Sequence, residues 1–165
     1  MKKIVFLFFI TISINFASSQ NYVLQNEILV FGFETQNGKK MVLAKDKNDA
    51  YIIYRFGTKN KIELEFPSKN EDSWKKFEYS FYLRGGGIEN EGMDLNYVKF
   101  SNGEYKYLIY DTYYSINNEK LLGIKITNLK SGEITDIVGK KGTRKGTLID
   151  FRFNKLLKIN DEIEE

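Results

Sequence analysis

Apolar and polar residues alternate strictly over many short segments of the chain. In KIELEFP, the side chains of Ile62, Leu64 and Phe66 alternate with charged ones, which predicts that these three share one face. EYSFYLR at 78–84 and GIKIT at 123–127 follow the same pattern. Segments of period two that are rich in Ile, Tyr, Phe and Val are typical of half-buried antiparallel strands.

Comparable segments cover most of the remaining chain. They lie near residues 22–34, 40–45, 50–57, 95–101, 104–114, 133–138, 147–153 and 155–159. The residues between them favour turns: Asn37-Gly38, 57–60, Asn102-Gly103, Asn117-Asn118 and Ser131-Gly132. Asn-Gly between alternating segments is a strong hairpin signal, because both residues tolerate positive φ.

One segment departs from the strand pattern. In SKNEDSWKKF, Ser68 and Glu71 fit a capping box, which predicts a short helical turn. We therefore expect an all-β fold, an antiparallel meander that forms a small β-barrel or a barrel-like sandwich of about 8–10 strands. Of the two forms we expect the barrel, because closure removes the exposed sheet edges that a soluble protein must otherwise protect.

The first residues have the layout of a secretory signal peptide. A lysine pair precedes a mostly apolar run at 4–16, and small residues precede Gln20. The run is shorter than the roughly 20 residues that a membrane-spanning helix needs. We expect residues 1–19 to be cleaved and residues 20–165 to form a single domain in the periplasm or outside the cell, without a membrane anchor.

Composition excludes most catalytic chemistry. The chain contains no histidine and no cysteine, so a Ser-His-Asp triad, a Cys-His pair and the two main zinc ligands are absent. A glycosidase with two carboxylates stays formally open, but the acidic residues mostly occupy solvent-facing strand positions. We therefore expect no enzymatic activity, no catalytic residue, no metal and no cofactor.

Charge does not point to nucleic acid as a partner. Without Lys2 and Lys3 the chain carries 23 basic and 22 acidic residues, and they are spread along the sequence. A basic patch is the electrostatic signature of nucleic-acid binding, and the pattern lacks one.

A glycine run interrupts the strands at FYLRGGGIENEGMDLNY, residues 81–97. Gly85, Gly86 and Gly87 can form a backbone nest for an anion, with Arg84 assisting. In a second interpretation, carboxylate and amide oxygens bind Ca²⁺, although their spacing departs from the calcium-loop pattern. The ligands in that case are Glu89, Glu91, Asp94 and Asn96.

The third interpretation of this segment is structural. Glycine allows backbone conformations that other residues avoid, so the run can form a corner between two strands. Arg84 would then pair with Asp94 and hold the loop. We expect a corner, with a recognition site that includes Arg84, Asp94 and Asn96 as the competing hypothesis, since loops on rigid scaffolds often carry function.

A second candidate site is the cationic segment GKKGTRKGT at 139–147. Lys141, Arg144 and Lys145 are its candidate binding residues. The competing interpretation is an exposed hairpin loop that is kept soluble by its charges.

Two resemblances extend this picture. YIIYRFGTKNKIELEFP, WKKFEYSFYLRGGG, DLNYVKF and GTLIDFR together resemble a family of small exported bacterial β-proteins of uncharacterised function, over residues 27–160. That resemblance implies a secreted β-domain and supplies no catalytic residues. KSGEI at 130–134 and the 139–147 segment are similar to loops of periplasmic inhibitors of C-type lysozyme, which implies a cationic loop facing the active-site carboxylates of a lysozyme.

The expected function is therefore that of an exported, monomeric, non-catalytic module that binds another exported protein. An inhibitor or immunity-type protein against a lysozyme-like hydrolase or a toxin is the specific form we expect. The alternative is a carrier of a small apolar ligand inside the barrel, which requires an open apolar cavity.

Overall fold

A computed structural model describes residues 21–160 of the chain, and the predicted signal peptide lies outside them. The first sheet contains, in spatial order, β10 (Lys145–Gly146), β1 (Glu27–Glu34), β2 (Lys40–Asp46), β3 (Ile52–Thr58) and β4 (Lys61–Phe66). The second contains β11 (Lys158–Ile159), β5 (Glu78–Arg84), β6 (Met93–Asn102), β7 (Tyr105–Tyr114), β8 (Glu119–Asn128) and β9 (Ile134–Val138). Within this range the short 3₁₀ helices are η1 (Glu71–Lys76), η2 (Ile88–Asn90), η3 (Lys141–Thr143) and η4 (Ile149–Phe153).

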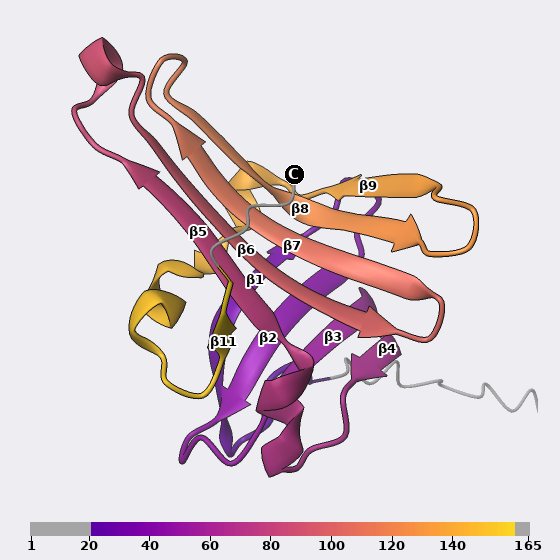
Figure 1. The fold of residues 1–165 in the computed structure, drawn as a ribbon. Helices are drawn as coiled ribbons and strands as arrows, with labels where there is room; N and C mark the ends of the chain where they lie inside the picture. The colour runs from indigo at the N-terminus through magenta and orange to yellow at the C-terminus, as the bar shows by residue number, and fades with distance from the viewer. Residues whose placement is uncertain (1–20, 161–165) are drawn as a thin grey trace, which may run out of the picture.

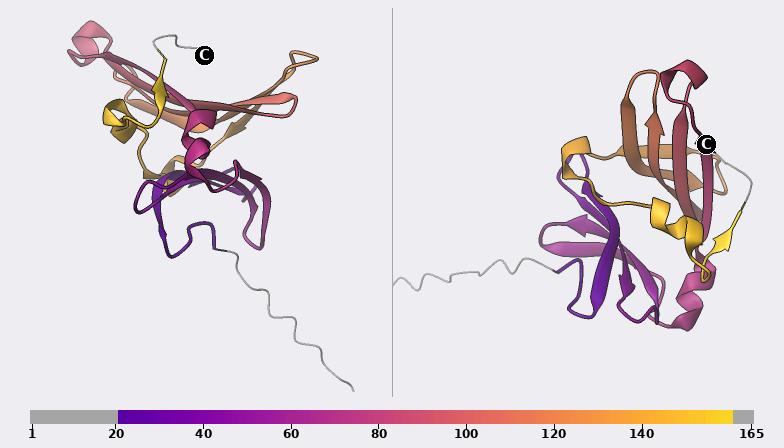
Figure 2. Two further views of the ribbon diagram at one scale, coloured as in Figure 1. Left: turned by 60° about the horizontal axis from the view of Figure 1, so that its bottom comes forward. Right: turned by 90° about the vertical axis from the view of Figure 1, so that its left-hand side faces the viewer.

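The two sheets face each other without closing into a barrel (Figures 1 and 2). Paired strands are antiparallel apart from β11, which pairs with β5 in parallel. The predicted all-β antiparallel fold is thus confirmed, in its barrel-like sandwich form. None of the helices in residues 21–160 has the length and apolar character needed to cross a membrane.

The chain crosses between the sheets at three places. The first crossing, from β4 to β5, runs through η1. The second returns from β9 through η3 to β10 at the edge of the first sheet, and the third leads from β10 through η4 to β11 at the edge of the second sheet. Because these crossings are loops and short helices rather than hydrogen-bonded strands, the two sheets keep separate edges.

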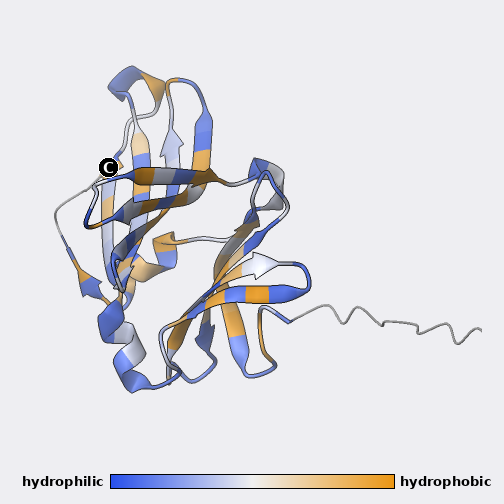
Figure 3. Ribbon diagram, turned by 90° about the vertical axis from the view of Figure 1, so that its right-hand side faces the viewer, coloured by the Kyte–Doolittle hydropathy of each residue, from blue (hydrophilic) through white to orange (hydrophobic). Residues whose placement is uncertain are grey.

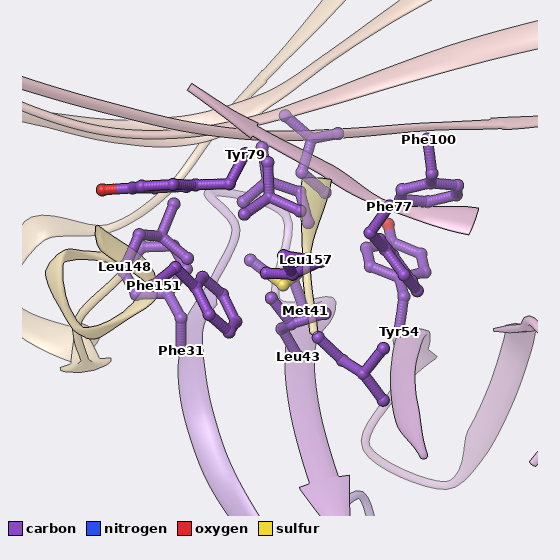
Figure 4. Packing of buried hydrophobic residues seen from close by; sticks show 14 of the residues in the cluster. Phe31, Met41, Leu43, Tyr54, Phe77, Tyr79, Phe100, Leu148, Phe151 and Leu157 are labelled. Atoms are coloured by element: carbon purple, nitrogen blue, oxygen red, sulfur yellow. The ribbon is translucent and has the colours of Figure 1, made fainter. Parts of the chain in front are cut away.

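The main hydrophobic core lies between the sheets and is rich in aromatic side chains. Figure 4 shows that side chains from the first sheet, the second sheet and the C-terminal segment meet there, among them Phe31, Tyr54, Tyr79 and Phe151. Phe100 stacks on Tyr107 with ring centroids 4.7 Å apart. Such aromatic pairs add stability beyond the apolar area that they bury.

Hydropathy alternates along the strands, as their period of two requires (Figure 3). The hairpin turns fall where the Asn-Gly signals predicted them. Gly38 (φ 80°) and Gly103 (φ 59°) both have the positive φ that these turns require.

Two local predictions are wrong. Residues 147–153, predicted as a strand, contain η4, in which the N–H of Phe151 donates to the carbonyl of Leu148 at 3.1 Å. Leu148 and Phe151 both reach the core because residues three apart share a side of a 3₁₀ turn. The helical turn η1 exists, but Asn70 is its N-cap and makes no side-chain cap bond, so Ser68 forms no capping box.

Candidate functional site

The inner face of the second sheet changes from apolar to polar along its strands. Register places its residues in rows across β5, β6, β7 and β8: Tyr79, Val98, Ile109 and Ile124; then Phe81, Asn96, Asp111 and Leu122; then Leu83, Asp94, Tyr113 and Lys120. The first row belongs to the core, and the last row contains an acidic and a basic residue. Figure 2 shows this end of the sheet projecting past the first sheet.

A pocket of about 350 Å³ occupies this polar part of the inner face. It is lined by Asp94, Asn96, Asp111, Thr112, Tyr113, Asn118, Lys120, Arg144 and Ile149. Three strands and the β7–β8 turn supply most of these residues, whereas the segments around η3 and η4 supply the last two. Pockets for small ligands start at about 300 Å³, so the volume suits a small molecule or a single large side chain.

A hydrogen-bonded network forms one wall of this pocket. Arg152 bonds Asp94 and also donates to Asn96 Oδ1 at 2.9 Å, and the hydroxyl of Tyr79 donates to the same Asn96 oxygen at 2.6 Å. Asn96 Nδ2 donates in turn to Asp94 Oδ1 at 2.6 Å. Burial raises the pKa of Tyr79 to about 12, although Arg152 acts in the opposite direction. The network holds Asn96, which is almost fully buried, in one orientation.

The guanidinium of Arg152 also lies over an aromatic ring. Its central carbon is 4.8 Å from the ring centroid of Phe81. Its Nε is buried and has no hydrogen-bond acceptor among the described residues. The cation–π contact offsets part of the cost of that unsatisfied donor.

A bidentate ion pair forms the second wall. Arg144 donates from Nε to Asp111 Oδ1 at 2.9 Å and from Nη2 to Asp111 Oδ2 at 2.7 Å. The hydrogen bond to Asp111 raises the pKa of Arg144 above its ordinary value. Paired forks of this kind fix geometry as well as charge, so the segment after η3 is held against β7.

The structure brings together residues from both predicted candidate groups. Asp94 and Asn96 come from the glycine segment and Arg144 from the cationic segment, and all three line the pocket. Arg84 does not join them, and its predicted pairing with Asp94 is wrong. Arg84 lies opposite Met93, and since successive residues of a strand point to opposite faces, Arg84 faces outward and Asp94 inward.

The glycine run is tied into a corner by its own neighbours. Arg84 Nε donates to the carbonyl of Glu91 at 3.0 Å, and Asn90 Nδ2 donates to that of Gly85 at 2.8 Å. Gly86 and Gly87 have positive φ, at 92° and 63°. These contacts support the structural interpretation of Gly85, Gly86 and Gly87. Across residues 21–160 the structure has no group of three His, Cys, Asp or Glu side chains that could hold a metal ion.

The cationic segment is likewise built into the fold. Gly139 forms an isolated antiparallel β-bridge with Thr35, the residue that follows β1. The ammonium of Lys141 lies 3.7 Å from a carboxylate oxygen of Glu119. Lys145 is exposed in β10, opposite Gly32. Arg144 is thus the member of this segment that reaches the pocket.

Sequence reasoning missed Asp111, Lys120 and Arg152. A signal for the first was present: in YLIYDTYY, Asp111 occupies the same strand face as the core residue Ile109. A polar residue at a core-facing position marks either a buried ion pair or a site. Arg152 gave no such signal, because its segment is a 3₁₀ turn whose placement depends on the tertiary fold.

Comparison with protein-family models, with curated proteins and with solved structures found no match for the chain.

Proposed function

We propose that the protein is an exported, non-catalytic module that binds another exported protein through the projecting end of the second sheet. The observation that carries this proposal is a pair of exposed apolar side chains at that end. Ile88 in η2 is 69 % exposed, and Ile116 in the β7–β8 turn is 56 % exposed. Exposed apolar groups that cluster beside polar residues are typical of protein interaction sites.

The two tips that carry these side chains are joined. Ser115 Oγ donates to the carbonyl of Gly87 at 3.0 Å, and the N–H of Ser115 donates to that of Gly92 at 2.8 Å. The β5–β6 connection and the β7–β8 turn therefore lie side by side (Figure 1). Ile88 and Ile116 thus stand on two connections that are hydrogen-bonded to each other. Holding the connections in place before binding lowers the entropy cost of binding a partner.

The helix η4 carries two further exposed apolar residues. Ile149 of η4 lines the pocket, and Phe153 at the end of η4 is almost fully exposed. Interfaces are usually anchored by a few aromatic or aliphatic side chains around a polar centre. The arrangement of tips, pocket and η4 fits that description.

The non-catalytic part of the proposal rests on the state of the acidic residues. Asp94 and Asp111 are the carboxylates of the pocket, and each is bonded to an arginine. A glycosidase needs one carboxyl group to hold a proton near neutral pH. Each of these carboxylates is thus engaged by an arginine, and the pocket lining offers no pair of unengaged carboxyl groups for that chemistry.

The carrier alternative is less well supported. Its ligand would occupy the space between the sheets, where aromatic side chains pack against one another. Phe66 stacks on Phe100 with centroids 5.0 Å apart, and Tyr54 lies 5.0 Å from the same ring. A ligand would have to displace rings that are already closely packed.

An inhibitor of a lysozyme-like hydrolase remains the specific form that we propose. The tips are better placed than the cationic segment to enter an enzyme cleft. In that segment Arg144 is bonded to Asp111 and Lys141 to Glu119, so these charges are partly neutralised.

Capture and inhibition assays test this proposal. The immobilised protein is exposed to periplasmic and secreted extracts and to a panel of purified lysozymes, and each captured protein is purified and titrated. The tip variant is Ile88→Ser with Ile116→Ser. The matched control is Leu129→Ser with Ile134→Ser at the other end of the same sheet, where the two side chains are 55 % and 62 % exposed.

We expect a partner that binds the wild type and the control equally and binds the tip variant at least about tenfold more weakly. Circular dichroism establishes that all variants fold. A partner that binds the tip variant as tightly as the wild type, or the absence of any partner, would contradict the proposal.

A further inference from the structure

The geometry points to a second role for the pocket: we propose that it binds a monosaccharide that carries a carboxylate, such as a hexuronic acid. This inference concerns a small ligand and does not rest on the proposed protein partner. It follows from the charges, the free hydrogen-bonding groups and the apolar surfaces of the pocket.

The charges of the pocket leave one cation in excess. Asp94 is bonded to Arg152, and Asp111 to Arg144. Lys120 also lines the pocket, and within residues 21–160 no carboxylate forms an ion pair with it. Its ammonium lies 6.0 Å from the ring centroid of Tyr113. A pocket with a single uncompensated cation attracts a ligand with one negative charge.

Further hydrogen-bond donors line the same pocket as Lys120. Arg144 uses Nε and Nη2 for Asp111, which leaves the two N–H groups of Nη1 without an acceptor in the described part of the chain. Asn118 adds a side-chain amide at the pocket edge. A carboxylate accepts about four hydrogen bonds, so one carboxylate can accept from both Lys120 and Arg144, which line the same pocket.

A free acceptor stands beside the donors. Asp94 accepts from Arg152 and Asn96 on Oδ1, and no donor among residues 21–160 bonds its Oδ2. A hydroxyl group is both donor and acceptor, so it can donate to this oxygen while accepting from Asn118. A simple carboxylate such as acetate cannot use Asp94 in this way, because it has no hydroxyl to donate and would meet a like charge.

Apolar surface completes the pocket. Tyr113 and Ile149 line it beside the polar groups, and sugar rings carry C–H faces that pack on such side chains. The volume of about 350 Å³ lies at the lower end of the range for small-ligand pockets, about 300–1,000 Å³. One ring with a carboxylate and hydroxyls therefore matches the pocket in size, charge and hydrogen bonding.

The pocket is also built rather than accidental. Asn96 and Asp111 are almost fully buried, and their partners hold them in place before any ligand arrives. Asn118 adopts a left-handed conformation, with φ 48°, in the β7–β8 turn. Preorganised groups of this kind raise affinity by reducing the cost of ordering.

Backbone amide NMR titration tests the inference on the folded protein. The probes are D-glucuronate, its neutral counterpart D-glucose, and acetate. We expect glucuronate alone to give saturable shifts in residues 94–96, 111–113 and 118–120, with a Kd of the order of 1 mM. Glucose lacks the charge and acetate lacks the hydroxyls, so both should bind at least about tenfold more weakly.

Two variants and one control sharpen the result. Lys120→Gln removes the excess cation and should weaken glucuronate binding about tenfold or more. Asn118→Gly removes the side-chain amide, while glycine still allows the positive φ at this position. It should weaken glucuronate binding about threefold. Lys59→Gln, in the exposed β3–β4 turn, should leave binding unchanged.

Three results would overturn the inference. The first is no saturable shift with glucuronate. The second is equal binding of glucose or acetate, which would mean that the pocket requires no carboxylated sugar. The third is unchanged glucuronate binding by the folded Lys120→Gln variant, which would place the ligand elsewhere. None of these results bears on the capture of a protein partner by the tips.

Discussion

Two arginine–carboxylate networks of this protein share their chemistry and differ in their surroundings. On the outer face of the first sheet, Arg55 bonds Glu27 through Nη1 at 2.6 Å and Nη2 at 2.7 Å. Its side chain is 1 % exposed, and that of Glu27 is fully buried. In the pocket, Arg144 also makes a bidentate bond to Asp111, through Nε and Nη2, but its side chain is 33 % exposed.

The difference arises from what covers each pair. The segment before β1 passes over the outer face of the first sheet (Figure 2), and the carbonyl of Tyr22 accepts a hydrogen bond from Arg55 at 2.8 Å. The tyrosine ring packs with Ile53 in a second hydrophobic cluster. Between residues 21 and 160, no comparable segment covers Arg144, whose side chain is partly exposed. An enclosed pair therefore ties two parts of the fold together, whereas an open pair leaves donors for a ligand.

Breaking the enclosed pair should have the largest effect. Arg55→Met leaves Glu27 buried without a counter-charge, so we expect the free energy of unfolding to fall by about 3–5 kcal/mol. Urea denaturation measures this loss. The double variant Arg55→Met with Glu27→Leu should recover most of it, because no buried charge is left. A loss below about 1 kcal/mol would show that the pair is not enclosed in solution.

The enclosed pair should also govern acid stability. Burial alone would raise the pKa of Glu27, but bonds from Arg55, from the N–H of Leu24 and from Tyr51 lower it below its ordinary value. A carboxyl group whose pKa is lower in the folded state stabilises fully above its unfolded pKa, about 4.3, and loses this contribution as pH falls through the folded pKa.

Glu27→Gln should therefore cost about 2 kcal/mol at pH 7. The difference in unfolding free energy between wild type and variant should shrink as pH falls below about 4. Urea denaturation across this pH range is the measurement. A difference that stays constant with pH would mean that Glu27 titrates normally in the folded protein.

Breaking the open pair should have a smaller effect. Arg144→Met removes a partly exposed partner and opens buried Asp111 to the water of the pocket, so we expect a loss of about 1–2 kcal/mol. Thermal and urea unfolding give the value. A loss as large as that of Arg55→Met would erase the contrast between the two networks and would make the pocket pair structural.

The smallest effect on the free energy of unfolding is expected at Arg84, which directly precedes the glycine run. Arg84 contacts Glu91 on the exposed corner, with Nη2 and Oε2 3.4 Å apart. Exposed pairs contribute little, so Arg84→Ala should change the unfolding free energy by no more than about 0.5 kcal/mol. A destabilisation above about 1.5 kcal/mol would indicate that the corner depends on this side chain.

Local pattern predicted the strands well and their faces less well. Ile62, Leu64 and Phe66 were expected on one face. A register shift after Phe56 places Ile62 opposite Gly57, where it packs on the outer cluster, while Leu64 and Phe66 pack on the core. A bulge of this kind inserts one residue and reverses the alternation beyond it. The pairing partner decides its position, and a single strand does not reveal it.

The candidate site was predicted in parts. The sequence directed attention to Asp94, Asn96 and Arg144, but it assigned them to two separate loops. Asp111 and Lys120 join them only because register aligns β6, β7 and β8 and because the chain returns from the second sheet to the first.

The sequence by itself determined the strands, the hairpin turns and the absence of histidine and cysteine chemistry, because alternation, turn residues and residue types act locally. Only the tertiary structure decided that the sheets form an open sandwich, that one arginine pair is enclosed and the other open, and that a polar pocket lies on a core-facing surface. The physical reason is that burial and ion pairing depend on which distant segments cover a side chain, and that coverage is set by packing between elements far apart in the chain.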